Sequence, residues 1–189
     1  MIKIGYQGVE NSNNHIAAEK FVQSNKMENC ILIPLVSSEN VVNHLLSKEI
    51  GLGIMAVSNS TIGDVKETKT AIDNKDLTEI SRIEIIIQHA AFKLQSSLSH
   101  LDIKYVVSHE AALAQCKNNI KLIYPNAKLI PIKNTGLGPQ MLVNGELDSS
   151  SIVLCPPKAG EKYGLVMDHE NLSDTKDNVT TFGIFKLAD

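Results

Sequence analysis

The amino-acid sequence predicts an α/β fold with mixed, mostly parallel sheets. Apolar, β-branched runs typical of strands alternate with segments of helical periodicity along the whole chain, and this alternation is characteristic of α/β domains. Small polar clusters follow the expected strands at Gly8–Asn14, Ser58–Thr61, Ser108–His109 and Asn134–Thr135. Because ligands of open α/β sheets collect at the carboxyl ends of strands, the four clusters together predict the lining of a ligand cleft.

The first fifty residues predict two strands and two helices. These elements are the strands Met1–Tyr6 and Ile31–Leu35 and the helices His15–Val22 and Glu39–Ser47. Each helix carries an apolar face at helical spacing. Ser37 and Ser38 are expected to cap the second helix, because a serine side chain accepts a hydrogen bond from the first turn.

The stretch Gly51–Val65 contains one of the polar clusters. An apolar run, Ile54–Val57, predicts a buried strand, the cluster Ser58–Thr61 follows it, and helical spacing resumes from Val65 to Ile72. Two interpretations stay open. The cluster could be an ordinary helix N-cap, which the local pattern favours. Alternatively, its backbone N–H groups and hydroxyls could bind a carboxylate or another anion.

The rest of the chain continues the alternation. Lys66–Glu79 is expected to be a solvated helix and connection, and Ser96–Ser99 a loop. The predicted strands are Ile83–Ile87, Lys104–Val107, Ala127–Ile132, Ser151–Leu154, Leu165–Asp168 and Thr181–Leu187. The predicted helices are Ala111–Cys116 and Leu137–Val143. The second of these contains a glycine and a proline, which weaken a helix.

Composition argues against several classes of partner. The hydrophobic fraction of 43% is ordinary for a globular protein, and the formal net charge of −3 does not favour nucleic acid or an anionic membrane surface. No apolar run approaches the roughly 20 residues that cross a bilayer, and the N-terminus lacks a signal peptide's long apolar stretch. Three widely spaced cysteines suggest neither a disulfide framework nor a zinc site. We therefore expect a cytoplasmic protein with no membrane or nucleic-acid partner.

The histidines predict no metal site. His15, His44, His100 and His169 lack the spacing typical of metal ligands, and we expect solvated or capping roles for all four. His89 follows a β-branched run, so we expect it to be structural and to pair with the backbone.

Six segments carry a resemblance to a known family. They are Tyr6–Glu10, Gly53–Val65, Glu84–His89, Ser108–Cys116, Tyr163–Leu165 and Asn178–Phe182. In order and spacing they resemble the motifs of prephenate dehydratases, and Ser108–Cys116 is the most specific single match. The resemblance covers nearly the whole chain. It corresponds to the family's catalytic domain, without the regulatory amino-acid-binding domain that is usually attached.

This resemblance implies a two-lobed fold similar to periplasmic binding proteins, with the active site in the cleft between the lobes. Residues 1–76 and 160–189 are expected to form the first lobe, and residues 77–159 the second. Enzymes of this family convert prephenate to phenylpyruvate with loss of water and carbon dioxide, a step of phenylalanine biosynthesis that needs no metal or organic cofactor. The resemblance therefore implies a lyase that acts on a small-molecule carboxylate. Family members commonly associate, so a homodimer is expected.

The site residues are likewise implied by the resemblance. Thr180 matches the threonine of the family's Thr-Arg-Phe motif, which is assigned to the leaving hydroxyl, and it is the expected catalytic residue. The expected substrate-binding residues are Asn59, Ser60, Thr61, Ser108, His109, Thr135, Thr181 and Phe182. From the residues alone, Thr180 could equally be an ordinary strand residue, and His109 could simply begin a helix.

The chain departs from the family at two charged positions. Thr181 stands where the family has arginine, and Ser58 where it has glutamate. A guanidinium binds a carboxylate through two parallel N–H bonds of ~1.5–3 kcal/mol each. Its replacement therefore predicts that a dicarboxylate binds weaker by two or more orders of magnitude, with Lys133 and Lys158 as partial substitutes. The one arginine, Arg82, precedes the strand Ile83–Ile87, far from the matching position.

Two other functions stay open. One is a prephenate decarboxylase, because some family members without the arginine release carbon dioxide and keep the hydroxyl. The other is a protein that keeps the cleft, has lost the chemistry and binds a small carboxylate or an aromatic amino acid. Glu110 replaces a proline of the family, and it would oppose an anionic ligand if its side chain faced the cleft.

Overall fold

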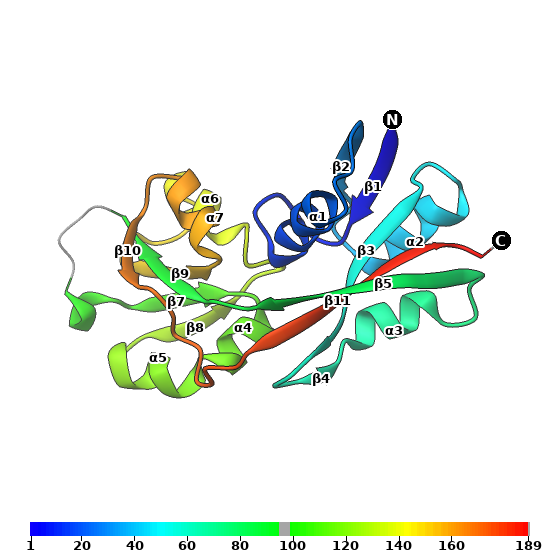
Figure 1. Ribbon diagram of the computed structural model, residues 1–189. Helices are drawn as coiled ribbons and strands as arrows, with labels where there is room; N and C mark the ends of the chain where they lie inside the picture. Colours follow the sequence, from blue (N-terminus) through cyan, green and yellow to red (C-terminus); the bar gives the residue numbers. More distant parts are fainter. Residues whose placement is uncertain (95–98, 189) are drawn as a thin grey trace. The chain divides into compact units, whose positions relative to one another are not determined.

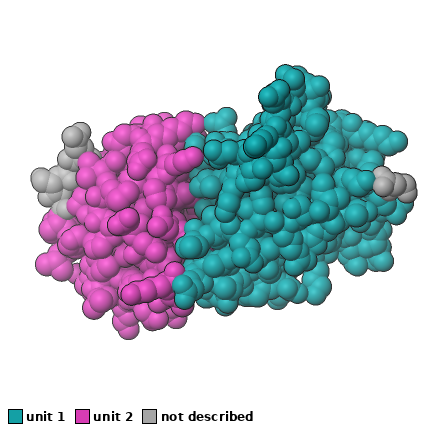
Figure 2. Space-filling view, in the orientation of Figure 1, with its two compact units in different colours: residues 1–86, 177–189 teal, residues 87–176 magenta. Residues whose placement is uncertain are grey.

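The computed structural model describes residues 1–94 and 99–188, so most of the predicted loop Ser96–Ser99 lies outside the described residues (Figure 1). The chain divides into two compact units (Figure 2). Residues 1–86 and 177–189 form the first unit, and residues 87–176 form the second. These boundaries differ from the expected ones at 76/77 and 159/160. The reason is strand pairing: β5 (Leu77–Ile86) pairs along its whole length with β11 (Val179–Leu187) of the first unit.

The first unit contains a mixed sheet to which both ends of the chain contribute (Figure 1). Its further strands are β1 (Ile2–Tyr6), β2 (Cys30–Pro34), β3 (Leu52–Asn59) and the short β4 (Gly63–Asp64). The strand order is β2-β1-β3-β11-β5, with β4 paired to β3. β1 runs parallel to β2 and β3, whereas β11 runs antiparallel to β3 and β5. The last strand of the chain thus lies inside the sheet and joins β3 to β5.

The helices of the first unit are α1 (Asn13–Ser24), α2 (Ser38–Leu46) and α3 (Lys66–Ile72). Ser37 is the cap of α2, as predicted, because its Oγ accepts a hydrogen bond from the backbone N–H of Asn40 at 3.1 Å. α2 lies very close to β3 at Gly53. A Cβ atom at Gly53 would lie 2.6 Å from Val41 Cγ1 of the helix. The glycine therefore allows this close packing, which no larger residue would permit.

The second unit contains a sheet whose central strand, β9, is buried on both faces. Its strands are β6 (Ala90–Lys93), β7 (Tyr105–Ser108), β8 (Lys128–Pro131), β9 (Ser151–Cys155) and β10 (Val166–His169), in the order β10-β6-β9-β7-β8. Along β9, Ile152 and Leu154 belong to one hydrophobic core, and Val153 and Cys155 belong to another. Successive side chains of a strand point to opposite faces, so both faces of this strand are covered.

The helices of the second unit are short. They are α4 (Glu110–Gln115), α5 (Lys117–Ile123), α6 (Gly138–Val143), α7 (Pro157–Lys162) and the 3-10 turn η1 (His100–Asp102). α4 and α6 agree with the predicted helices, whereas α5 and α7 were not predicted. In the ranges that the structure describes, no helix has both the length and the apolar character needed to cross a membrane.

The sheets are mixed, as predicted, but they are less parallel than expected. Among the described strands, the parallel pairs are β1·β2, β1·β3, β7·β8 and β7·β9. The antiparallel pairs are β3·β4, β3·β11, β5·β11, β6·β9 and β6·β10. β4 follows β3 directly, and β11 returns from the second unit to pair with β3 and β5. Sequence periodicity does not report strand direction, so the antiparallel pairs were not indicated.

The helix-cap interpretation of Ser58–Thr61 is wrong. Ser58 and Asn59 are the last residues of β3, residues 60–62 form a turn, and the chain returns as β4 antiparallel to β3. α3 begins only at Lys66, and its N-cap residue, Val65, makes no side-chain hydrogen bond to the helix. The polar cluster therefore closes a short hairpin, for which small polar residues are also favoured.

His89 is structural, as predicted, but its side chain pairs with another side chain. The residue is buried, and its Nε2 lies 2.7 Å from Oε1 of Gln115 in α4. The backbone of His89 is bonded as well, because its N–H donates to Asn171 Oδ1 and its C=O accepts from Leu172 N. Burial lowers the pKa of His89, and the hydrogen bond to Gln115 opposes that shift only in part.

The lowered pKa of His89 predicts an acid-sensitive contribution to stability. The unfolded chain takes up a proton at this residue near pH 6.5, whereas the folded chain does so only at lower pH. The contribution of His89 to the free energy of unfolding therefore decreases as the pH falls below about 6.5. When the pH is lowered from 7.5 to 5.5, the free energy of unfolding of the wild-type protein should fall by up to about 1.4 kcal/mol more than that of His89→Gln. Urea denaturation at the two pH values measures this difference. His44→Gln, at a partly exposed histidine, should behave like wild type, and equal losses in wild type and His89→Gln would contradict the assignment.

Candidate active site

The hydroxyl of Thr180 lies at the centre of a buried hydrogen-bond network in the first unit. Thr180 is paired with Asn59 across β11 and β3, and Asn59 Nδ2 donates to Thr180 Oγ1 at 2.9 Å. The same amide nitrogen also lies 2.7 Å from Asn178 Oδ1 and 3.1 Å from the carbonyl of Val179, so its two hydrogens are shared among three acceptors. The side chains of Asn59, Asn178 and Thr180 are all buried. The network holds the Thr180 hydroxyl in one position.

This network leaves the proton of Thr180 available. A threonine hydroxyl has one donor hydrogen and two acceptor lone pairs, and Asn59 occupies one of the lone pairs. Among the described residues, the structure shows no acceptor for the hydrogen of Thr180. The hydroxyl can therefore donate its hydrogen to a bound oxygen while Asn59 fixes its position.

The turn after β3 is held by the other atoms of Asn59 and by Ser60. Asn59 Oδ1 accepts from the backbone N–H groups of Thr61 and Ile62 at 2.9 and 3.2 Å. Ser60 Oγ donates to the carbonyl of Asp177 at 2.8 Å and accepts from Val179 N at 2.9 Å. Ser60 thus ties the turn to the start of β11 with its own hydroxyl, whereas the side chain of Thr61 is exposed.

Thr181 does not lie on the same face as Thr180. Thr181 is paired with Ser58 across β11 and β3, as Thr180 is with Asn59, and neighbouring residues of a strand point to opposite faces. Ser58 lines a pocket together with Thr68 and Lys69 of α3. The positions at which the family has arginine and glutamate are therefore directly opposed, at a separation that suits a cross-strand ion pair.

Arg82 lies nearer to this position than the sequence suggested. It is inside β5, opposite Gly183 of β11, and it lines the same pocket as Ser58. Its guanidinium is engaged by Glu79, with Nε donating to Oε1 at 2.8 Å and Nη2 to Oε2 at 3.0 Å. The expectation that Arg82 lies far from residue 181 is wrong, because the antiparallel pairing of β5 and β11 brings the two strands together.

Phe182 packs in the protein interior. Its side chain is 1% exposed, and it lies opposite Ala56 after a β-bulge that follows Thr181. This burial leaves no aromatic face for a ligand, so Phe182 supports the strand that carries Thr180.

His109 lies at a pocket at the carboxyl ends of β7 and β8 in the second unit. Its Nδ1 accepts a hydrogen bond from the backbone N–H of Ala111 at 3.2 Å, so the histidine caps α4. The pocket is lined by His109, Glu110, Pro131, Ile132, Lys133, Leu137 and Met141. It is mainly apolar and has one cationic side chain, Lys133. This combination suits an organic anion with an apolar body, although Glu110 adds a negative charge.

Ser108 and Thr135 differ in their access to this pocket. Ser108 is completely buried, and its hydroxyl donates to the carbonyl of Leu154 at 2.8 Å, so it holds β7 against β9. Thr135 is half-buried and follows Asn134, whose Oδ1 accepts from the backbone N–H of Gly136 at 2.9 Å. Neither residue is among those that line the pocket.

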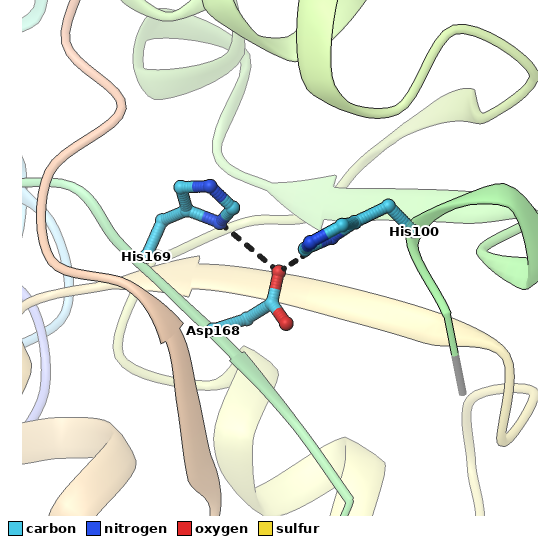
Figure 3. Close-up of side chains that lie close together, drawn as sticks. All are labelled: His100, Asp168 and His169. Atoms are coloured by element: carbon cyan, nitrogen blue, oxygen red, sulfur yellow. Dashed lines mark hydrogen bonds and ion pairs between the residues drawn. The ribbon is translucent and has the colours of Figure 1, made fainter. Parts of the chain in front are cut away.

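A second cluster of the second unit was missed by sequence analysis. His100 Nδ1 and His169 Nδ1 lie 3.2 and 3.0 Å from Asp168 Oδ2 (Figure 3). Tyr124 donates its hydroxyl hydrogen to the same oxygen, and Lys93 Nζ lies 2.7 Å from Oδ1. Burial alone would raise the pKa of Asp168, but these hydrogen bonds and the charge of Lys93 lower the pKa to about 2. The two histidines were expected to be solvated or capping; both remain partly exposed, but each also contacts Asp168, which was not expected. His100 lies 68 residues before Asp168 in the sequence, so no local pattern could have indicated the cluster.

Comparison with known proteins identifies the family. The family model for prephenate dehydratase matches residues 4–189. The bifunctional chorismate mutase/prephenate dehydratase of Buchnera aphidicola is 25% identical over 183 residues, which is 96% of this chain and 46% of that protein. The chain thus spans about half the length of the curated relatives it matches.

Solved structures show the same fold. A prephenate dehydratase from Arthrobacter aurescens superposes with a TM-score of 0.78 at 22% identity, over 100% of this chain and 60% of that one. A periplasmic substrate-binding protein of an ABC transporter from Coxiella burnetii gives a TM-score of 0.56 at 10% identity, over 100% of this chain and 85% of that one. The expected α/β fold similar to periplasmic binding proteins is therefore confirmed. Since the family model matches almost every residue, the chain belongs to the prephenate dehydratase family.

Proposed function

We propose that this chain converts prephenate to phenylpyruvate, water and carbon dioxide, the dehydratase step of phenylalanine biosynthesis. The observation that carries the proposal is the Thr180 hydroxyl, which is buried, held by Asn59 and able to donate its hydrogen. Family membership supplies the reaction, and Thr180 matches the family threonine that is assigned to the leaving hydroxyl.

The reaction needs help mainly at the departing oxygen. The bond between the ring and its carboxylate breaks, carbon dioxide leaves, and the electron pair forms a ring double bond. The C–O bond to the ring hydroxyl breaks at the opposite carbon, and the departing oxygen takes up one proton to leave as water. In our proposal Thr180 donates a hydrogen bond, and then the proton, to this oxygen and regains a proton from water. Asn59 is a positioning residue that holds Thr180.

We further propose that the His109 pocket contributes to substrate binding. Lys133 supplies a positive charge for a carboxylate, and the apolar residues Ile132, Leu137 and Met141 suit the ring of the substrate. His109 itself acts by keeping α4 in place through its cap on Ala111. For Thr61 and Thr135, binding roles rest on the family resemblance.

A prephenate decarboxylase is the second candidate, because the family's arginine and glutamate are both replaced, by Thr181 and Ser58. Mass analysis of the product separates the two reactions, since a decarboxylase would retain the hydroxyl oxygen that a dehydratase releases. A protein that only binds a small carboxylate would release no carbon dioxide from prephenate. Its ligand, for example phenylalanine or phenylpyruvate, would raise the melting temperature.

Substitution of Thr180 tests the proposed proton donor. We expect Thr180→Val to lower kcat for phenylpyruvate formation by about 10²-fold or more, because proton donation contributes about 10²–10⁴-fold. Thr180→Ser keeps a hydroxyl and should retain activity within about tenfold of wild type. Phenylpyruvate is measured by the absorbance of its enol in alkali. Thr78→Val, at an exposed threonine of β5 in the same sheet, is the matched control and should be fully active. Full activity of a folded Thr180→Val would disprove the role.

The face occupied by residue 181 predicts the effect of restoring the family's charges. We expect Thr181→Arg alone to change KM for prephenate by less than about threefold, because Thr181 and Thr180 point to opposite faces. The double variant Ser58→Glu/Thr181→Arg should raise the free energy of unfolding by about 0.2–1 kcal/mol through a cross-strand ion pair. A KM at least tenfold lower in the single variant would instead show that residue 181 binds the substrate carboxylate, as the resemblance implied.

We also propose that the protein is a cytoplasmic homodimer. The family resemblance supports the dimer, and β8 lies at a sheet edge with Leu129 and Ile130 exposed, so it can pair with another chain. Cys30, Cys116 and Cys155 are free thiols, which is usual in a reducing compartment. Light scattering after size-exclusion chromatography should give twice the chain mass of 20.6 kDa, and a mass of one chain would contradict the dimer.

A further inference from the structure

Three metal-ligating atoms converge at one point on the second unit. They are one ring nitrogen each of His100 and His169 and a carboxylate oxygen of Asp168, and all lie within 4.8 Å of one another. Figure 3 shows both imidazoles directed at the carboxylate. His100 comes from η1, and Asp168 and His169 come from the end of β10. None of these residues lines the His109 pocket or belongs to the Thr180 network, so the proposed dehydratase chemistry gives the cluster no task.

The spacing of these atoms suits a transition-metal ion. Asp168 Oδ2 lies 3.2 Å from His100 Nδ1 and 3.0 Å from His169 Nδ1. In a tetrahedral zinc site with ligands at about 2.0–2.1 Å, adjacent ligand atoms lie roughly 3.3 Å apart. The carboxylate is thus already at a suitable separation from each imidazole, and the two ring nitrogens, which lie within 4.8 Å of each other, need only a small adjustment to bind one ion.

The surroundings of the cluster favour preorganised binding. The side chain of Asp168 is 5% exposed, whereas those of His100 and His169 are 51% and 32% exposed, so an ion can reach the histidines from solvent. The hydroxyl oxygen of Tyr124 lies 3.2 Å from His169 Nδ1. The ring of Tyr124 packs against the imidazoles of both His100 and His169. These contacts restrict the side chains before any ion binds, which lowers the entropic cost of binding.

We propose that His100, Asp168 and His169 bind a divalent transition-metal ion, with Zn²⁺ as the best match to two imidazole nitrogens and one carboxylate oxygen. Asp168 binds through Oδ2 alone, because Lys93 holds Oδ1 at 2.7 Å. A water molecule completes the four positions, and Tyr124 keeps its hydrogen bond to Oδ2 without contacting the ion. The ion joins η1 to the end of β10 and stabilises the second unit.

The ammonium group of Lys93 sets the expected strength of the site. Its positive charge offsets that of the carboxylate and reduces the attraction for a dication. Lys93 therefore makes this a site of moderate affinity, and we expect dissociation constants in the micromolar range instead of the far tighter binding of closed four-ligand structural zinc sites.

Titration of the full chain with Zn²⁺ tests the proposal. Protein treated with a chelator and dialysed should bind one equivalent of ZnCl₂ in isothermal calorimetry, and its melting temperature should rise. His100→Ala and His169→Ala should each weaken binding at least tenfold. His44→Ala is the matched control. His44 Nε2 also lies near a carboxylate, 3.5 Å from Glu49 Oε2, but the described cluster of two histidines and a carboxylate does not include it. This variant should bind Zn²⁺ like wild type.

Co²⁺ supplies a second measurement that reports geometry. Bound to two imidazoles and a carboxylate in a tetrahedral site, it should give visible absorption bands that both histidine variants lose. Circular dichroism confirms that each variant is folded, and if one histidine variant does not fold, the other decides the test. Absence of binding and of any thermal shift in wild type would overturn the proposal. Equal affinity in wild type and in a folded His100→Ala or His169→Ala variant would also overturn it, since it would show an adventitious ion only.

Discussion

The side-chain amide of Asn59 is the contact on which the candidate site of the first unit depends. Its nitrogen donates to Asn178, Val179 and Thr180, and its oxygen accepts from the N–H groups of the following turn. These partners lie about 120 residues apart in the sequence, and the amide joins them where the chain returns from the second unit. A buried amide without such partners would be costly. Strand pairing and the position of the Thr180 hydroxyl therefore depend on the same residue.

Alternation of side chains along a strand explains much of what the structure adds. It places Thr180 beside Asn59 and Thr181 beside Ser58 on opposite faces of the first sheet. Two replacements that look independent in the sequence thus occupy one cross-strand pair. An arginine opposed by a glutamate is neutral as a pair, so replacing both residues does not change the net charge there. The replacement of the arginine alone was expected to weaken binding of a dicarboxylate. Since its partner is replaced as well, this expectation does not follow from the arrangement of the two positions.

The second unit combines groups from distant segments in two separate places. The pocket beside His109 forms where β7 and β8 end side by side, and its apolar walls and Lys133 come from the segment after β8. The cluster around Asp168 forms where η1 and residue Tyr124 meet the end of β10. Both arrangements depend on strand pairing, because paired strands bring together loops that are far apart in the sequence.

Local sequence determined the α/β class, most strands, the Ser37 cap and the capping position of His109, because apolar periodicity and cap chemistry are properties of neighbouring residues. Motif order also indicated the family. Only the tertiary structure decided that Ser58–Thr61 closes a hairpin, that β5 extends back to Leu77 and that Arg82 lies beside β11. It alone brought His100 to Asp168 and His169. Each of these outcomes depends on contacts with a strand or loop that is distant in the sequence. A local sequence pattern contains no information on such contacts, although they supply the free energy of pairing.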